Sequence, residues 1–133
     1  MDNQDIRWKQ RFQNFEKSLL NLESGLSLDS PSLIEKAGLI QFFEICFEQS
    51  WKVLKEYLAA QGLADVKYPR ESIKKAFETE LISNGQTWLE ALNNRNISSH
   101  TYDDVLAEKV VAGIRTSYYP MLKELYDRLK QEV

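Results

Sequence analysis

The segment 33–58 constrains the fold most, because its apolar residues form two separate stripes along a helix, the first with a residue every three or four positions. The first stripe contains Leu33, Ala37, Ile40, Phe43, Phe47, Trp51, Leu54 and Leu58, and the second contains Leu39, Phe42, Cys46, Val53 and Tyr57. At about 100° of rotation per residue, the stripes lie more than 100° apart on one helix. Two alternatives stay open: a second copy covers the second stripe in a two-fold dimer, or helices of the same chain cover both stripes.

Helical periodicity also precedes this segment. A single seam runs along a first helix through Trp8, Phe12, Phe15, Leu19, Leu22 and Leu26. Ser32 and Glu35 then have the spacing of a capping box and predict the start of the long helix, although the sequence leaves open which serine caps it. The seam requires a second helix to pack against it.

Three further helices are expected after the long one. Ile73, Ala76, Phe77, Leu81 and Ile82 indicate a short third helix, and Trp88, Leu89 and Leu92 a fourth. The last helix is expected to begin near Thr101, whose hydroxyl would cap it, and one face carries Leu106, Val110, Ile114, Tyr118, Leu122, Leu125 and Leu129. The predicted fold is all-α: an up-and-down four-helix-type bundle with an extra short helix, forming one domain over residues 1–133 and assembling as a dimer or larger oligomer.

Composition excludes several classes of protein. A formal charge of −3 argues against a protein that binds nucleic acid by bulk electrostatics, and DNA is not an expected partner. The single cysteine, Cys46, lies in an apolar run and is expected to be a buried thiol, so neither a disulfide within the chain nor a cysteine metal site is expected. Without a signal-peptide pattern or a membrane-length apolar run, the expected location is the cytoplasm.

One polar stretch could hold chemistry. It lies between the fourth and last predicted helices and contains Arg95 and the only histidine, His100, followed by Tyr102. Guanidinium and imidazole near a helix start suit a phosphate. The alternative is structural: Arg95 binds terminal carbonyls, His100 caps a helix and Tyr102 packs. Asp103 and Asp104 would repel a free phosphate or could orient His100.

The same stretch carries a family resemblance. It resembles the R-x4-H-x-Y signature of the HEPN superfamily, and the whole chain resembles the branch of nucleotidyltransferase substrate-binding proteins. The residues that carry this resemblance are Trp88, Arg95, Asn96, Ser99, His100, Thr101, Tyr102 and Asp103.

The resemblance implies a helical homodimer that belongs to a toxin-antitoxin pair with a minimal nucleotidyltransferase. Arg95 and His100 would be a metal-independent ribonuclease pair, and Tyr102 would accept AMP from the partner. Polar residues of the same segment would support phosphate or nucleotide binding: Asn96, Ser99, Thr101 and Asp103. ATP and Mg²⁺ would be bound by the nucleotidyltransferase, and no cofactor or metal is expected in this chain.

Three functional hypotheses follow. In the first, the chain is a partner protein that presents Tyr102, because it has no glycine loop or carboxylate cluster for nucleotidyl transfer. In the second, it is a ribonuclease, and since one chain has one histidine, acid and base roles require two protomers. The acidic composition and the lack of a basic stripe weaken the case for a broad RNA surface. In the third, it is a helical scaffold without a site.

Overall fold

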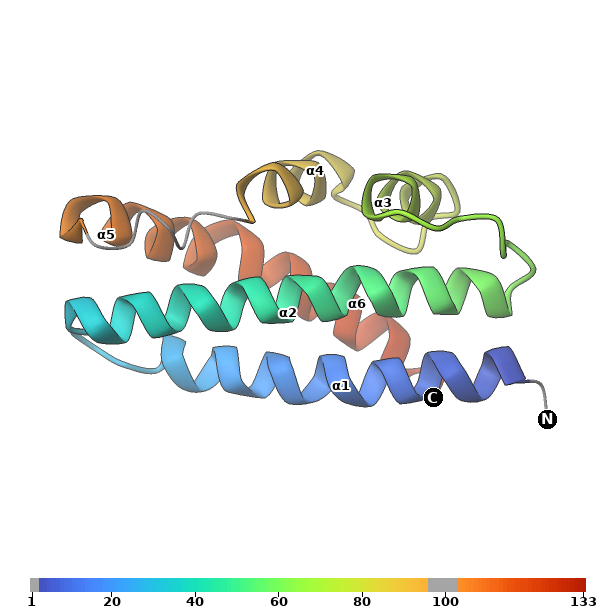
Figure 1. The fold of residues 1–133 in the computed structure, drawn as a ribbon, viewed down its shortest axis with the longest axis horizontal. Coiled ribbons are helices and arrows are strands. Elements are labelled where there is room, and N and C mark those ends of the chain that lie inside the picture. The colour runs from blue at the N-terminus through green and yellow to red at the C-terminus, as the bar shows by residue number, and fades with distance from the viewer. Residues whose placement is uncertain (1–2, 96–102) are drawn as a thin grey trace.

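Helices account for nearly all of the regular structure in this computed structural model, which describes residues 3–95 and 103–133. No strand occurs within these residues. The elements in chain order are α1 (Asn3–Leu26), α2 (Leu33–Ala60), α3 (Pro69–Glu78), α4 (Gly85–Asn94), α5 (Asp104–Gly113), a π-helical turn (Ile114–Tyr118) and α6 (Tyr119–Lys130) (Figure 1). The predicted all-α bundle is confirmed. No helix of this described part has the length and apolarity needed to cross a membrane.

The first two helices form a long antiparallel hairpin. The seam predicted for the first helix is buried from Trp8 to Leu22, and Leu26 packs against the edge of the core. Ser32 caps α2: its hydroxyl accepts from the Glu35 amide at 3.1 Å, while the Glu35 carboxylate accepts from the Ser32 amide at 2.8 Å. The reciprocal bonds of this capping box fix where α2 begins.

The second stripe of α2 is covered within the chain, so the alternative in which a second copy covers it in a dimer is wrong. Leu39, Cys46, Val53 and Tyr57 are all buried, and of this stripe only Phe42 is exposed, at 37%. The Tyr57 ring packs edge-on against Trp8 of α1, with centroids 4.9 Å apart. Helices of one chain therefore cover α2 on two sides, which is the other alternative that the sequence left open.

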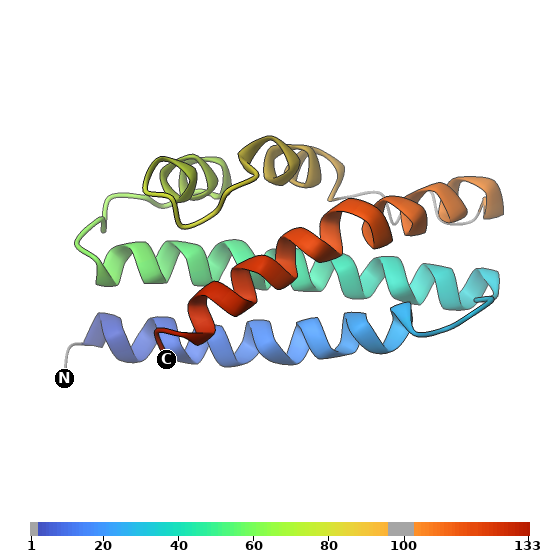
Figure 2. The same ribbon diagram turned by 180° about the vertical axis from the view of Figure 1, so that it is seen from behind.

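The first stripe of α2 faces the remaining helices. Phe43 stacks on Tyr118 of the π-helical turn at 5.3 Å, and Phe47 contacts Trp88 of α4 at 5.8 Å between centroids. Figure 2 shows α2 between α1 and the layer formed by α3 and α4, with the last helix crossing it diagonally. α2 is thus the central element of the bundle.

The short helices differ from the prediction at two points. Ile73 and Ala76 are buried on α3, but Phe77, predicted as core, is half exposed. Leu81 and Ile82 are buried in the connection to α4 and not on a helix. An apolar residue can satisfy helical spacing and still face solvent when no neighbouring element covers that side.

The last helix begins later than predicted and contains an irregular turn. Its cap is Asp103, whose Oδ1 accepts from the amides of Val105 at 2.9 Å and Leu106 at 3.3 Å; the predicted cap, Thr101, lies outside the described residues. The π-helical turn directly precedes α6 and its Pro120. Because proline has no amide hydrogen for the ladder, widening the helix there accommodates it without a break.

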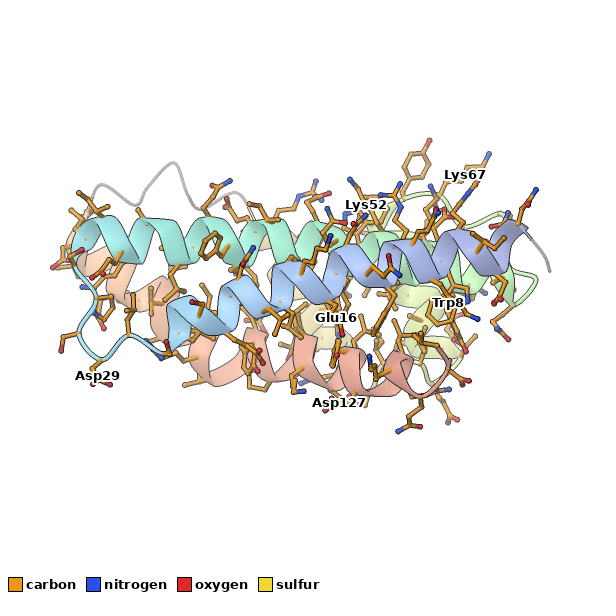
Figure 3. All side chains as sticks on the ribbon, turned by 90° about the horizontal axis from the view of Figure 1, so that it is seen from below. Trp8, Glu16, Asp29, Lys52, Lys67 and Asp127 are labelled. Carbon is orange, nitrogen blue, oxygen red and sulfur yellow. The ribbon has the colours of Figure 1, made fainter. Side chains whose placement is uncertain are left out.

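Two tyrosines fasten the last helix to α1. Tyr126 donates to Glu16 at 2.5 Å, and Tyr119 donates to Glu23. Figure 3 shows Glu16 between α1 and α6. The hydrogen bond to Glu16 raises the pKa of Tyr126 to about 12 and lowers that of Glu16. These bonds hold α6 against α1 beside the aromatic stack of Tyr126 on Phe12.

Candidate functional site

Arg95 is the C-terminal cap of α4 and the first residue of the predicted motif. Its side chain is 34% exposed, so it is neither sealed in the core nor fully in solvent. Asp103 is the other predicted site residue that the structure describes. The remaining ones lie outside the described residues: Asn96, Ser99, His100, Thr101 and Tyr102.

Packing and hydrogen bonds fix the end of α4 that carries Arg95. Trp88 is buried against Phe47 of α2, and Asn94 Nδ2 donates to the Tyr118 hydroxyl at 3.3 Å. α4 is therefore held to α2 through its middle and to the π-helical turn at its end. This arrangement sets the direction in which Arg95 leaves the helix.

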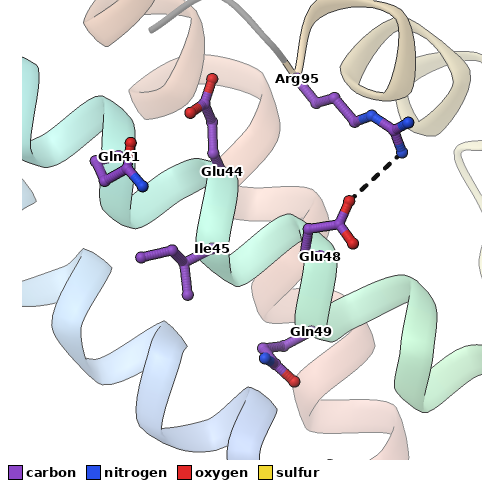
Figure 4. Close-up of a pocket in the computed structure, with 6 residues that line it drawn as sticks. All are labelled: Gln41, Glu44, Ile45, Glu48, Gln49 and Arg95. Atoms are coloured by element: carbon purple, nitrogen blue, oxygen red, sulfur yellow. Dashed lines mark hydrogen bonds and ion pairs between the residues drawn. The ribbon is translucent and has the colours of Figure 1, made fainter.

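Glu48 of α2 is the residue of this site that the sequence did not reveal. Its Oε1 lies 3.5 Å from Arg95 Nη1 (Figure 4), while its Oε2 accepts from the Trp51 indole at 3.0 Å. Trp51 thus orients the carboxylate, and the carboxylate orients the guanidinium. The two charged residues are 47 positions apart in the chain, which is why spacing along one helix could not associate them.

Arg95 stands over an open pocket of about 320 Å³ on the exposed face of α2. The lining residues are Gln41, Glu44, Ile45, Glu48, Gln49 and Arg95 (Figure 4). Arg95 has five N–H donors, and its side-chain bond to a described residue, Glu48, involves Nη1; a guanidinium with this fork of donors suits a phosphate or carboxylate ligand. Two glutamates in the lining oppose a free anion, so a bound phosphate would have to meet Arg95 and not the middle of the pocket.

The residues that follow the motif are anchored to α2. Lys36, a buried lysine of α2, contacts Asp104 at 2.8 Å and Glu108 at 2.7 Å. Hydrogen bonding to these two carboxylates raises the pKa of Lys36. Asp104 is therefore paired with a cation and Asp103 is engaged in capping, which reduces the repulsion that both aspartates would exert on a phosphate.

Comparison with known proteins gives consistent matches. A family model described as nucleotidyltransferase substrate binding protein like matches residues 10–131. The probable ribonuclease HepT of Haemophilus influenzae is 30% identical over 117 residues, covering 77% of this chain and 76% of that protein. The range matched by the family model includes Arg95 and the whole connection between α4 and α5.

Two solved structures share the fold. A crystal structure of a protein from Thermus thermophilus has a TM-score of 0.79 and 29% identity, covering 87% of this chain and 98% of that one. A Haemophilus influenzae structure, described as the fold of a substrate binding domain of a nucleotidyltransferase, has a TM-score of 0.66 and 27% identity. That similarity covers 97% of this chain and all of the other.

Proposed function

This chain belongs to the nucleotidyltransferase substrate binding protein-like family, and from that premise we propose that it is the partner subunit of a minimal nucleotidyltransferase. It is the toxin component of a toxin-antitoxin pair, and Tyr102 is the residue to which the partner transfers AMP. The observation that carries the proposal is the position of Arg95: at the last turn of an anchored helix, partly exposed and oriented by Glu48. A purely structural arginine would instead be expected in the core or bound to the helix carbonyls.

The transfer of AMP requires from this chain mainly the acceptor tyrosine. The Tyr102 phenol loses its proton to a base, its oxygen attacks the α-phosphorus of ATP, an O–P bond forms, and pyrophosphate leaves. A phenol of ordinary pKa near 10 is mostly protonated at neutral pH, so His100 or a partner residue must accept the proton. Arg95 would hold the phosphate that remains on the tyrosine.

Complex formation tests the partner role. Purified chain and nucleotidyltransferase should co-elute as one species in size-exclusion chromatography with light scattering. The Tyr102→Phe chain should form the same complex, because the substitution removes the acceptor oxygen and leaves the surface otherwise unchanged. Failure of both chains to bind an active nucleotidyltransferase would contradict the partner role itself.

A second candidate function is metal-independent RNA cleavage, favoured by the 30% identity to the probable ribonuclease HepT. In a homodimer, His100 of one protomer would take the proton of a 2′-hydroxyl, whose oxygen attacks the adjacent phosphorus. The P–O5′ bond then breaks, and the second protomer's His100 protonates the leaving oxygen while Arg95 stabilises the charge. Ile45, 42% exposed at the rim of the Arg95 pocket, is an apolar side chain that such a dimer could cover.

The ribonuclease is tested with RNA in the presence of a chelator. Cleavage should persist when divalent ions are removed and disappear in both His100→Ala and Arg95→Ala. Both variants should retain the wild-type melting temperature, since neither residue belongs to an apolar stripe. A loss of several kcal/mol of stability would instead indicate a structural role.

A further inference from the structure

A second polar groove lies between α1 and α2, away from the pocket of Arg95. It has a volume of about 410 Å³, and we call it the basic groove. One face of α1 contributes Arg7, Gln10, Arg11 and Asn14, and α2 contributes Lys55 and Glu56. Three cations and one carboxylate thus line a groove in a chain whose formal charge is −3.

Glu56 is the unusual member of this set. Its side chain is only 9% exposed, and its Oε2 accepts no hydrogen bond from any described residue. The ion pairs it makes are long: Arg7 Nε lies 3.5 Å from Oε2, and Lys55 Nζ lies 3.9 Å from Oε1. A buried carboxylate oxygen without a hydrogen bond is unfavourable, so it is available to accept a donor from a ligand.

Two cations, one in the lining of the groove and one beside it, supply unpaired positive charge among the described residues. Arg11 forms no ion pair with a described residue, and neither does Lys52, which precedes Glu56 by one helical turn. Figure 3 shows Lys52 at the outer edge of α2. Lys52 and Lys55 follow Glu48 by four and seven residues, so they share its face of α2 and lead from the Arg95 pocket to the groove over about 10 Å.

We propose that the basic groove binds a ribonucleotide unit of single-stranded RNA. Arg7, Arg11 and Lys55 contact phosphate oxygens, because arginine forks match that geometry. Glu56 Oε2 accepts a hydrogen bond from the ribose 2′-hydroxyl, a donor that DNA lacks. The ligand class agrees with the RNA-cleaving candidate function, but the groove contains no motif residue, so its RNA binding can be measured separately from cleavage and from AMP transfer. A free nucleotide has the same phosphate and ribose groups, and the experiment distinguishes it from an RNA strand as the natural ligand.

Fluorescence anisotropy with a labelled single-stranded RNA and the DNA of the same sequence tests the proposal. The wild type should bind RNA more tightly than DNA, and Arg11→Ala should weaken RNA binding about fivefold or more and lower the salt slope by about 0.7. Lys74→Ala, on α3 and outside the groove, is the matched control and should bind as the wild type does. Equal loss in the control, or none in Arg11→Ala, would overturn the proposal.

Glu56→Met separates recognition of ribose from simple charge attraction. Removing the acceptor should bring the ratio of RNA to DNA affinity close to one without weakening DNA binding, whereas a groove that attracts phosphate alone would show no preference in the wild type. Competition with AMP identifies the ligand of the groove. Displacement of RNA at micromolar AMP would indicate that the groove binds a free nucleotide, whereas no displacement would indicate that it binds an RNA strand. The same measurements on His100→Ala and Tyr102→Phe should be unchanged, so failure of the motif activities leaves this test intact.

Discussion

Trp88 anchors the helix that carries Arg95, and its replacement by alanine has a calculable effect. The side chain is 1% exposed, and among the residues of α4 only Ala91 is as deeply buried. Burying a tryptophan removes about 200 Å² from water, which at about 25 cal/mol per Å² sets an upper limit near 5 kcal/mol. Because the unfolded chain itself covers part of this area, Trp88→Ala should destabilise the protein by about 4 kcal/mol.

The assay combines thermal unfolding with hydrogen exchange. A loss of about 4 kcal/mol should lower the melting temperature by about 10 °C or more. Amide exchange should accelerate most in residues 85–95, because an isolated ten-residue helix is not stable once its anchor is gone. Trp88→Phe is the control: it keeps an aromatic ring against Phe47 and should lose only about 1–2 kcal/mol. A decrease below about 1 kcal/mol in Trp88→Ala, with unchanged exchange in α4, would refute this reasoning.

Three further predictions concern single side chains. Glu48→Ala should reduce the proposed AMP transfer or RNA cleavage, while its stability should change by less than about 1 kcal/mol because the pair with Arg95 is partly exposed. Glu48→Gln should retain part of that activity in the same kinetic assay. Equal loss in both variants would contradict a positioning role for Glu48. Tyr126→Phe should lose about 1 kcal/mol at neutral pH. The hydrogen bond from Tyr126 lowers the pKa of Glu16 in the folded protein, so its contribution to stability is complete above the carboxyl's ordinary pKa of 4.5. That contribution disappears as the pH falls through the lowered pKa of the folded state. Denaturant unfolding curves of the wild type and Tyr126→Phe should therefore converge in acid. Cys46, whose pKa burial raises to about 12, should react with thiol reagents at pH 8 only after unfolding; rapid labelling of the native protein would contradict the described core.

The periodic pattern identified faces of helices correctly but not always what covers them. The seam from Trp8 to Leu22 is buried as predicted, because strict three-and-four spacing defines one side of a helix. The second stripe of α2 also has helical spacing, yet periodicity gives no information on whether α1 or a second copy covers it. Phe77 shows that helical spacing also does not guarantee a cover, since this residue fits the pattern of a buried face but is half exposed.

The Arg95 site and the basic groove could not be predicted in full, because each is formed by segments that are distant in the sequence. Arg95 could be singled out from its local motif, but Glu48 becomes a neighbour only after α2 and α4 pack. The basic groove likewise combines Arg11 with Lys55, which are far apart in the sequence and brought together by the α1–α2 hairpin. Net charge could not reveal it, because an overall value of −3 is compatible with a local excess of cations.

The most direct test of the proposed function is the mass of this chain after incubation with its nucleotidyltransferase, ATP and Mg²⁺. We expect an increase by one or more AMP masses, located on Tyr102 by peptide mapping and absent from Tyr102→Phe. A chain incubated without the nucleotidyltransferase should keep its original mass. AMP on another residue, or no AMP when the nucleotidyltransferase is shown to be active, would contradict the assignment of Tyr102 as the acceptor.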